Sequence, residues 1–254
     1  MSPILLLFLL RANPLHPETV SDRILPALLV TAAFGVFAYL LRGVTQSGAL
    51  AGTLAAFVIY VGLGRGGFVT LVAVFAITWL CTRVGSAKKH QLGLAEDVRG
   101  RNASQVLANL GAAAVFAALA SKNSWFGLAS IAALAEAAAD TAQSEIGEIA
   151  SARAWLITNF REVAPGTDGG VTLPGLIAGA LAASAVAVTS RMTYVVDSNL
   201  AGIAASAGFL GTIVDSLLGA TLERRGWLDN NAVNFLSTVS SGAIAIALLR
   251  VFVQ

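Results

Sequence analysis

Apolar runs long enough to cross a lipid bilayer occupy most of this 254-residue chain. A membrane-spanning helix needs about 20 such residues, and eight runs come close to that length. They lie at Ile24–Leu41, Ser47–Leu63, Phe68–Arg83, Ser104–Ser121, Trp125–Gly147, Val171–Thr189, Leu200–Leu222 and Ala232–Val253. Because backbone polar groups in lipid need internal partners, the runs predict an all-α fold, a polytopic transmembrane bundle of about eight helices.

Composition and the two ends of the chain agree with one membrane domain. Charged residues make up 12% of the chain, against about 25% in soluble domains. Cys81 is the single cysteine and only two histidines are present, so an internal disulfide and a structural zinc site are excluded. Residues 1–23 are expected to form a short interfacial or packed segment, since they lack the pattern of a cleaved signal. Residues 24–254 then form a single transmembrane domain.

Basic residues fall mainly into loops on one side of this predicted bundle. They are Arg42, Arg83, Lys88, Lys89, Arg99, Arg101, Arg153, Arg161, Arg224 and Arg225. Because cytoplasmic loops carry an excess of Lys and Arg, this side is predicted to be cytoplasmic, with both termini outside. We expect the chain in the inner, or plasma, membrane.

Three carboxylates interrupt the apolar helices near that cytoplasmic side. Asp140 and Glu145 lie in A-D-T-A-Q-S-E-I-G, and Asp215 stands about two turns inside the end of a later helix. A charge at a helix centre costs roughly 2.5–3.5 kcal/mol on insertion scales, so such residues are functional or paired. We predict that all three are catalytic and bind Mg²⁺, which prefers carboxylate and phosphate oxygens. The alternative is that Asp140 and Glu145 form loop salt bridges with Arg153 or Arg161.

A glycine-rich turn follows the first two acids and precedes another apolar helix. Its successive backbone N–H groups can surround a phosphate, and Thr172 is placed to cap the next helix. The predicted phosphate-binding residues of this turn are Gly166, Thr167, Asp168, Gly169 and Gly170. A plain interfacial loop is the alternative.

Other polar residues gather at the same predicted end of the bundle. Arg101 and Asn102 open the fourth predicted helix, Asn231 and Asn234 open the eighth, and Arg161 precedes the glycine-rich turn. We predict that they contact phosphate or nucleotide, Arg101 foremost because a guanidinium grips two oxygens. The alternative for the asparagines is that they form hydrogen bonds between neighbouring helices. Five helices are thus expected to converge on one site.

Several common sites are excluded. Residues 62–67 match G-x-G-x-x-G but form a turn between two membrane helices, without the βαβ unit of a dinucleotide site. The sequence contains no P-loop, no serine nucleophile elbow, no histidine triad and no basic stripe for nucleic acid.

The polar motifs resemble those of a known integral-membrane family. They are G-R-N-A-S-Q-V-L-A-N (Gly100–Asn109), A-D-T-A-Q-S-E-I-G (Ala139–Gly147), P-G-T-D-G-G-V-T-L-P-G (Pro165–Gly175), D-S-L-L-G-A-T-L-E (Asp215–Glu223) and N-N-A-V-N-F-L-S (Asn230–Ser237). The family is domain of unknown function ninety-two, which includes phytyl-phosphate kinase and the animal transmembrane protein nineteen. Asp168 departs from it, since family members often carry Asn there.

The resemblance implies a kinase. Phosphoryl transfer from a nucleoside triphosphate, plausibly CTP, to a phytyl or other polyprenyl monophosphate would give the diphosphate, with Mg²⁺ as cofactor. Two alternatives stay open: a CTP-dependent lipid cytidylyltransferase, and a transporter for an ion or small solute that uses the same acidic residues. The expected partners are the nucleotide, the prenyl monophosphate and the bilayer, but not nucleic acid.

Overall fold

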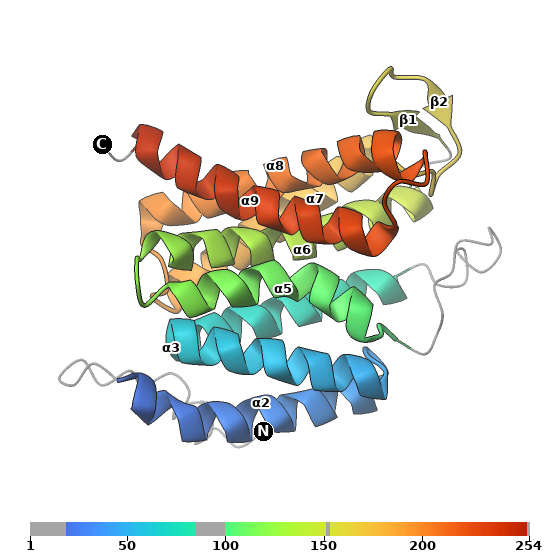
Figure 1. The fold of residues 1–254 in the computed structure, drawn as a ribbon. Coiled ribbons are helices and arrows are strands. Elements are labelled where there is room, and N and C mark those ends of the chain that lie inside the picture. Colours follow the sequence, from blue (N-terminus) through green and yellow to red (C-terminus); the bar gives the residue numbers. More distant parts are fainter. Residues whose placement is uncertain (1–18, 85–99, 151–152, 253–254) are drawn as a thin grey trace.

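Seven α-helices dominate the computed structural model, which describes residues 19–84, 100–150 and 153–252 (Figure 1). They are α2 (Val20–Leu40), α3 (Gln46–Arg83), α5 (Ala103–Leu119), α6 (Trp125–Ala150), α7 (Leu173–Met192), α8 (Ser198–Leu218) and α9 (Asn230–Phe252). A π-helical turn, η1 (Gly219–Glu223), extends α8. The predicted N-terminal segment lies almost entirely outside the described residues, as do Lys88, Lys89 and Arg99.

Helix α3 contains two antiparallel spans. Gly64 within it has φ +71° and ψ −165°, which breaks an α-helix. The chain reverses there, because Trp79 and Arg83 near the end of α3 donate hydrogen bonds of 3.2 and 2.7 Å to the carbonyl oxygen of Leu41, just before its start. All eight predicted membrane segments are therefore present as helices, and the all-α bundle is confirmed. The glycines of residues 62–67 form the turn between two of them.

Helix α6 is the centre of the bundle. Every residue from Gly127 to Ala139 is buried, and α3, α5, α7, α8 and α9 all pack against this helix. Most of these residues are small, which lets neighbouring backbones approach closely. At Gly208 of α8, an added Cβ atom would lie 2.7 Å from the Cβ atom of Ala135. The acids that follow on α6 are thus carried by the most extensively packed helix of the described chain.

The outer surface of the bundle is apolar. Five described helices are long and apolar enough to cross a membrane, with α3 counted as one. Leu25, Leu29 and Leu40 of α2 expose 64, 66 and 71% of their surface. Exposed leucines in such numbers are typical of a surface that faces lipid acyl chains.

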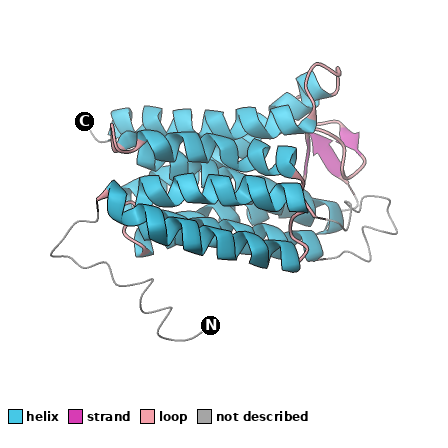
Figure 2. Ribbon diagram, turned by 60° about the horizontal axis from the view of Figure 1, so that its bottom comes forward, coloured by secondary structure: helices cyan, strands magenta, loops and turns pink. Residues whose placement is uncertain are grey.

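A small antiparallel sheet lies between α6 and α7, at one end of the bundle (Figure 2). Its strands are β1 (Ala154–Leu156), β2 (Glu162–Val163) and β3 (Gly170–Val171), in the order β2-β1-β3. The sequence analysis did not predict these strands. Beyond β3, Thr172 caps α7 as expected, its Oγ1 accepting a 3.1 Å hydrogen bond from the Gly175 amide.

Candidate functional site

A polar cavity of about 390 Å³ lies at the end of the bundle that carries the sheet. Helices α5, α6, α8 and α9 and the glycine-rich turn all contribute to its lining. Ten of the thirteen predicted site residues are there: Arg101, Asp140, Glu145, Gly166, Thr167, Asp168, Gly169, Gly170, Asp215 and Asn234. Segments more than 130 residues apart in the sequence therefore share one cavity.

Two carboxyl groups meet across this cavity. Asp140 of α6 and Asp215 of α8 lie within hydrogen-bonding reach of each other. Glu136, one turn earlier on α6, interacts electrostatically with both, and Ser237 of α9 is within hydrogen-bonding reach of Glu136 and Asp215. The Oδ2 atom of Asp215 is buried and has no hydrogen-bond partner among the described residues. Because like charges this close repel, the cluster requires a proton or a cation between the carboxyl groups.

Glu223 is a further acidic residue of the cavity, which the sequence analysis did not assign to the site. On an ideal α-helix it would lie about 80° around from Asp215. The wider turn of η1 separates the two residues and changes that relation. Glu223 interacts electrostatically with Asp140 and with Asp168 of the glycine-rich turn. The negative charge of the cavity therefore extends from α6 to this turn.

Arg101 is the one basic residue among the described residues that line the cavity. Its Nη2 atom donates a 3.1 Å hydrogen bond to Oγ1 of Thr141 on α6. Glu145, one turn further along α6, is buried and lines the same cavity. Arg153, just before β1, forms an exposed ion pair with Glu162 at 3.3 Å. Positive charge for a phosphate group thus comes from Arg101.

The glycine-rich turn lies directly on η1. Gly166 and Gly169 have φ angles of +81° and +72°, which only glycine adopts without strain. A Cβ atom on Gly169 would lie 2.4 Å from the backbone nitrogen of Ala220. The amides of Gly166, Asp168 and Gly169 have no acceptor in the described part of the chain. These N–H groups are available to an anion in the cavity.

A buried polar network fixes α6 against α8 beside the acids. The Oε1 atom of Gln143 accepts a 3.0 Å hydrogen bond from Thr212, and its Nε2 atom donates a 3.2 Å bond to Ser216. Gln143 and Ser216 also line the cavity. The sequence analysis did not assign them to the site, and an isolated Gln in an alanine-rich helix was the available signal. The network holds the backbones that carry Asp140 and Asp215.

Three predicted phosphate ligands lie outside the cavity lining. Asn102 caps α5, its Oδ1 accepting a 3.1 Å hydrogen bond from the Gln105 amide. Asn231 donates to Ser104 at 3.4 Å, which joins α9 to α5. Arg161 is exposed between β1 and β2. Their contact with phosphate stays a prediction.

The donor set of the cavity suits a Mg²⁺ ion that binds together with phosphate. Among the described residues, no three His, Cys, Asp or Glu side chains converge closely enough to enclose a metal ion by themselves. Asp140 and Asp215 offer carboxylate oxygens, including the buried Oδ2 of Asp215, which has no hydrogen-bond partner in the described ranges. Proteins often hold Mg²⁺ through one or two carboxylates while substrate phosphates and water complete the shell. The residues present fit that arrangement.

The part of the chain that matches known proteins includes every residue of this cavity. The family model described as integral membrane protein DUF92 matches residues 29–242. An uncharacterized membrane protein of Methanocaldococcus jannaschii is 29% identical over 227 residues, which are 89% of this chain and 94% of the relative. One of Synechocystis sp. is 30% identical over 198 residues, 75% of this chain and 77% of the relative.

A plant relative extends the similarity beyond microorganisms. The Arabidopsis thaliana protein VTE6, chloroplastic, is 28% identical over 225 residues, which are 84% of this chain and 67% of the relative. No solved structure matches the chain.

Proposed function

Because this chain belongs to the integral membrane protein DUF92 family, we propose that it is a membrane kinase for prenyl monophosphates. It transfers the γ-phosphoryl group of a nucleoside triphosphate, such as CTP, to a phytyl or other polyprenyl monophosphate. The observation that carries the proposal is the meeting of Asp140 and Asp215 beside Arg101 and the glycine-rich turn. The type of reaction is inferred from the resemblance of the motifs to those of phytyl-phosphate kinase.

The protein's task in such a reaction is to align two phosphates and screen their repulsion. An oxygen of the acceptor phosphate attacks the γ-phosphorus, the bond from that phosphorus to the bridging oxygen breaks, and the nucleoside diphosphate leaves. The acceptor is already an anion, so no strong general base is needed. The free amides of Gly166, Asp168 and Gly169 hold nucleotide phosphate oxygens, while Arg101 holds the phosphate that approaches from α5.

The carboxylates bring the donor phosphates into place. Asp140 and Asp215 would hold Mg²⁺, which when bound neutralises charge on the nucleotide phosphates. A metal-binding role for Glu145, which lines the same cavity, stays a prediction. Gln143 keeps α6 and α8 at the spacing that this requires, through its bonds to Thr212 and Ser216. The cavity lies at the membrane edge that we propose to be cytoplasmic, where nucleotide is present.

A single assay separates this proposal from its alternatives. Purified protein is incubated with Mg²⁺, a prenyl monophosphate and γ-labelled CTP or ATP. A kinase places the label in the lipid diphosphate, and a cytidylyltransferase releases it in pyrophosphate. If the label appears in neither product with either nucleotide, both enzyme activities are contradicted. The transporter is then the remaining alternative.

Matched variants connect the assay to the cavity. Asp140→Ala should abolish transfer while the bundle still assembles, because Gln143 and the packing of α6 are untouched. Glu162→Gln removes an exposed carboxylate of the sheet and should leave turnover unchanged. Transfer at the wild-type rate by the Asp140 variant would remove that residue from the mechanism.

A further inference from the structure

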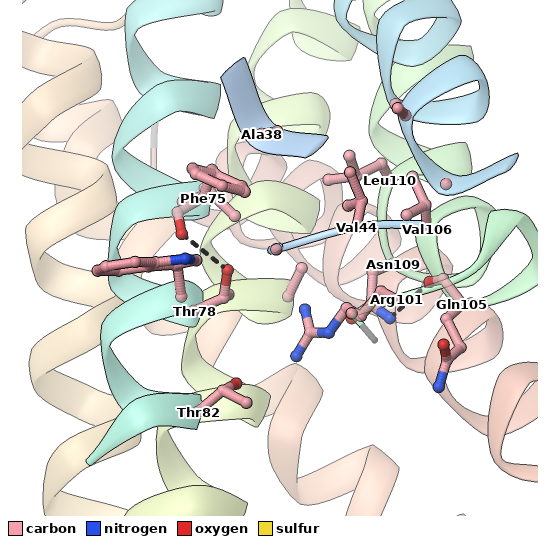
Figure 3. A pocket seen from close by; sticks show the side chains of 18 of the residues that line it. Ala38, Val44, Phe75, Thr78, Thr82, Arg101, Gln105, Val106, Asn109 and Leu110 are labelled. Atoms are coloured by element: carbon pink, nitrogen blue, oxygen red, sulfur yellow. Dashed lines mark hydrogen bonds between the residues drawn. The ribbon is translucent and has the colours of Figure 1, made fainter. Parts of the chain in front are cut away.

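A second cavity, of about 370 Å³, lies beside the polar one and has a different character (Figure 3). It is enclosed by α2, both halves of α3 and the first turns of α5. Its apolar lining includes Phe34, Leu71, Val74, Phe75, Val106 and Leu110. Along α3 the lining runs from Arg83 back to Leu71, a depth of about 18 Å at 1.5 Å per residue.

Basic residues gather at one end of this apolar cavity. Arg42, Arg83 and Arg101 all line it, and each lies at the sheet-bearing end of the bundle. Figure 3 shows Arg101 below Phe75 and Val106, on the side of Asn109 and Gln105. The Arg83 guanidinium is fixed in place, since it donates to the Leu41 carbonyl at 2.7 Å and stacks 4.0 Å from the centre of the Trp79 ring.

The two cavities share one wall. Arg101, Gln105, Asn109 and Glu145 line both of them. The polar cavity is rich in carboxylates, whereas the apolar cavity carries three arginines and Glu145 alone as an acid among its described lining. The two cavities therefore differ in the ligand that they suit. The polar cavity suits a cation bound to a nucleotide, and the apolar cavity suits an apolar molecule that carries a single anionic group.

We infer that the apolar cavity holds the acceptor lipid, with its hydrocarbon tail between α2, α3 and α5 and its monophosphate against Arg42, Arg83 and Arg101. This inference rests on the proposed function and assigns it a second compartment. A hydrated nucleotide base has no polar partners along the walls of Phe34, Phe75 and Leu110, whereas an isoprenoid chain buries its surface there. Arg101, common to both cavities, then lies where the two phosphates meet.

Gly52 of α3 lies along the proposed path of the tail. It lines the apolar cavity about one turn deeper than Gly48, whose Cβ position is blocked by the carbonyl of Arg101 at 2.1 Å. A Cβ atom on Gly52 would meet one atom within 4 Å, Cγ1 of Val106 at 3.7 Å, which is ordinary contact. A small substituent is therefore tolerated, while a larger one extends into the space of the tail.

Chain-length selectivity tests this assignment. Wild type, Gly52→Ala and Gly52→Leu are compared with geranyl and geranylgeranyl monophosphates as acceptors. Gly52→Leu should lower kcat/KM for the geranylgeranyl acceptor about tenfold or more and for the geranyl acceptor less than about threefold, because only the longer tail passes Gly52. Gly52→Ala should behave as wild type. Equal losses for both acceptors, or no loss for either, would overturn the assignment.

A second pair of variants tests the arginines that are proposed to hold the acceptor phosphate. Arg83→Gln should raise KM for the lipid monophosphate about tenfold and leave KM for the nucleotide unchanged. Arg191→Gln, which removes an exposed arginine at the far end of α7, should change neither. A rise in both KM values with Arg83→Gln would indicate general damage and contradict a specific role in holding the acceptor phosphate.

A binding measurement keeps this inference separate from the proposed reaction. A photoreactive diazirine analogue of geranylgeranyl monophosphate is crosslinked to the full chain without nucleotide, and labelled peptides are identified by mass spectrometry. Label on peptides with Phe75 and Val106 that unlabelled geranylgeranyl monophosphate displaces supports the lipid site, whether or not turnover occurs. Turnover with label elsewhere would overturn the site while the proposed kinase activity stood, as would displacement by geranylgeraniol equal to that by the monophosphate.

Discussion

Asp215 is the residue whose environment demands most explanation. Its Oδ2 atom is buried without a partner among the described residues, while Asp140 and Glu136 add like charge beside it. An unpaired buried charge costs several kcal/mol, and here no described basic residue of the cavity other than Arg101 offsets it. Such an arrangement lowers the stability of the empty protein and favours a bound cation.

We therefore expect the carboxylate of Asp215 to lower the stability of the metal-free protein and to be required for phosphoryl transfer. Asp215→Asn removes a charge from the cluster and keeps the shape, so we expect the metal-free protein to gain about 1 kcal/mol in free energy of unfolding. Transfer should fall about 100-fold or more, because even outer partners of metal ligands are worth 10–100-fold. Thermal denaturation in detergent and the labelled assay measure the two effects. A variant that is less stable and fully active would contradict both expectations.

Among the elements, the glycine-rich turn and η1 depend on each other. Gly169 has φ +72°, and the position of its missing Cβ atom is occupied by the backbone of Ala220. Gly219 in turn would place a Cβ atom 2.9 Å from the Gly169 amide nitrogen. These two contacts set the distance between the proposed phosphate-binding amides and the carboxylates of α8.

Substitution of Gly169 tests that dependence. Gly169→Ala imposes a strained φ and a clash with backbone, so the turn must move away from η1, at a cost of about 1–3 kcal/mol. We expect KM for the nucleotide to rise about tenfold. Gly202→Ala in α8 is the matched control, since a Cβ atom there meets nothing within 4 Å. Equal kinetics for the two variants would show that the turn does not hold the nucleotide.

Across the whole molecule, eight helical segments place both ends of the described chain opposite the cavity. Val20 begins α2 and Phe252 ends α9 at one end of the bundle, while β1, which contributes to the cavity lining, lies at the other (Figure 1). Charge bias in the loops predicts that the cavity end is cytoplasmic.

Cysteine labelling in sealed, right-side-out vesicles tests that orientation in a Cys81→Ser background. Lys122→Cys, between α5 and α6, should react with an impermeant maleimide from outside. Thr158→Cys, on the exposed turn between β1 and β2, should react only after the vesicles are opened. The reverse pattern would place the cavity outside the cell.

The sequence predicted the helices well because hydropathy alone specifies them, and Gly64 marked the reversal within α3. The strands were missed because two or three residues carry no periodicity. Asn102 caps α5, and because a helix cap and a phosphate ligand favour the same residue at the same position, the sequence does not separate the two roles. Glu223 was missed because α-helical spacing separates it from Asp215, and a π-helical turn is not visible in sequence.

Binding of Mn²⁺ in place of Mg²⁺, followed by electron paramagnetic resonance, tests most directly whether the cavity carboxylates and nucleotide phosphates share one cation. The carboxylates alone do not enclose a metal ion, so Mn²⁺ should bind weakly without nucleotide and tightly with CTP or ATP, with hyperfine coupling to ³¹P. Asp215→Asn should abolish that signal and Arg191→Gln should keep it. Nucleotide-dependent Mn²⁺ binding that survives Asp215→Asn undiminished would contradict the proposed site.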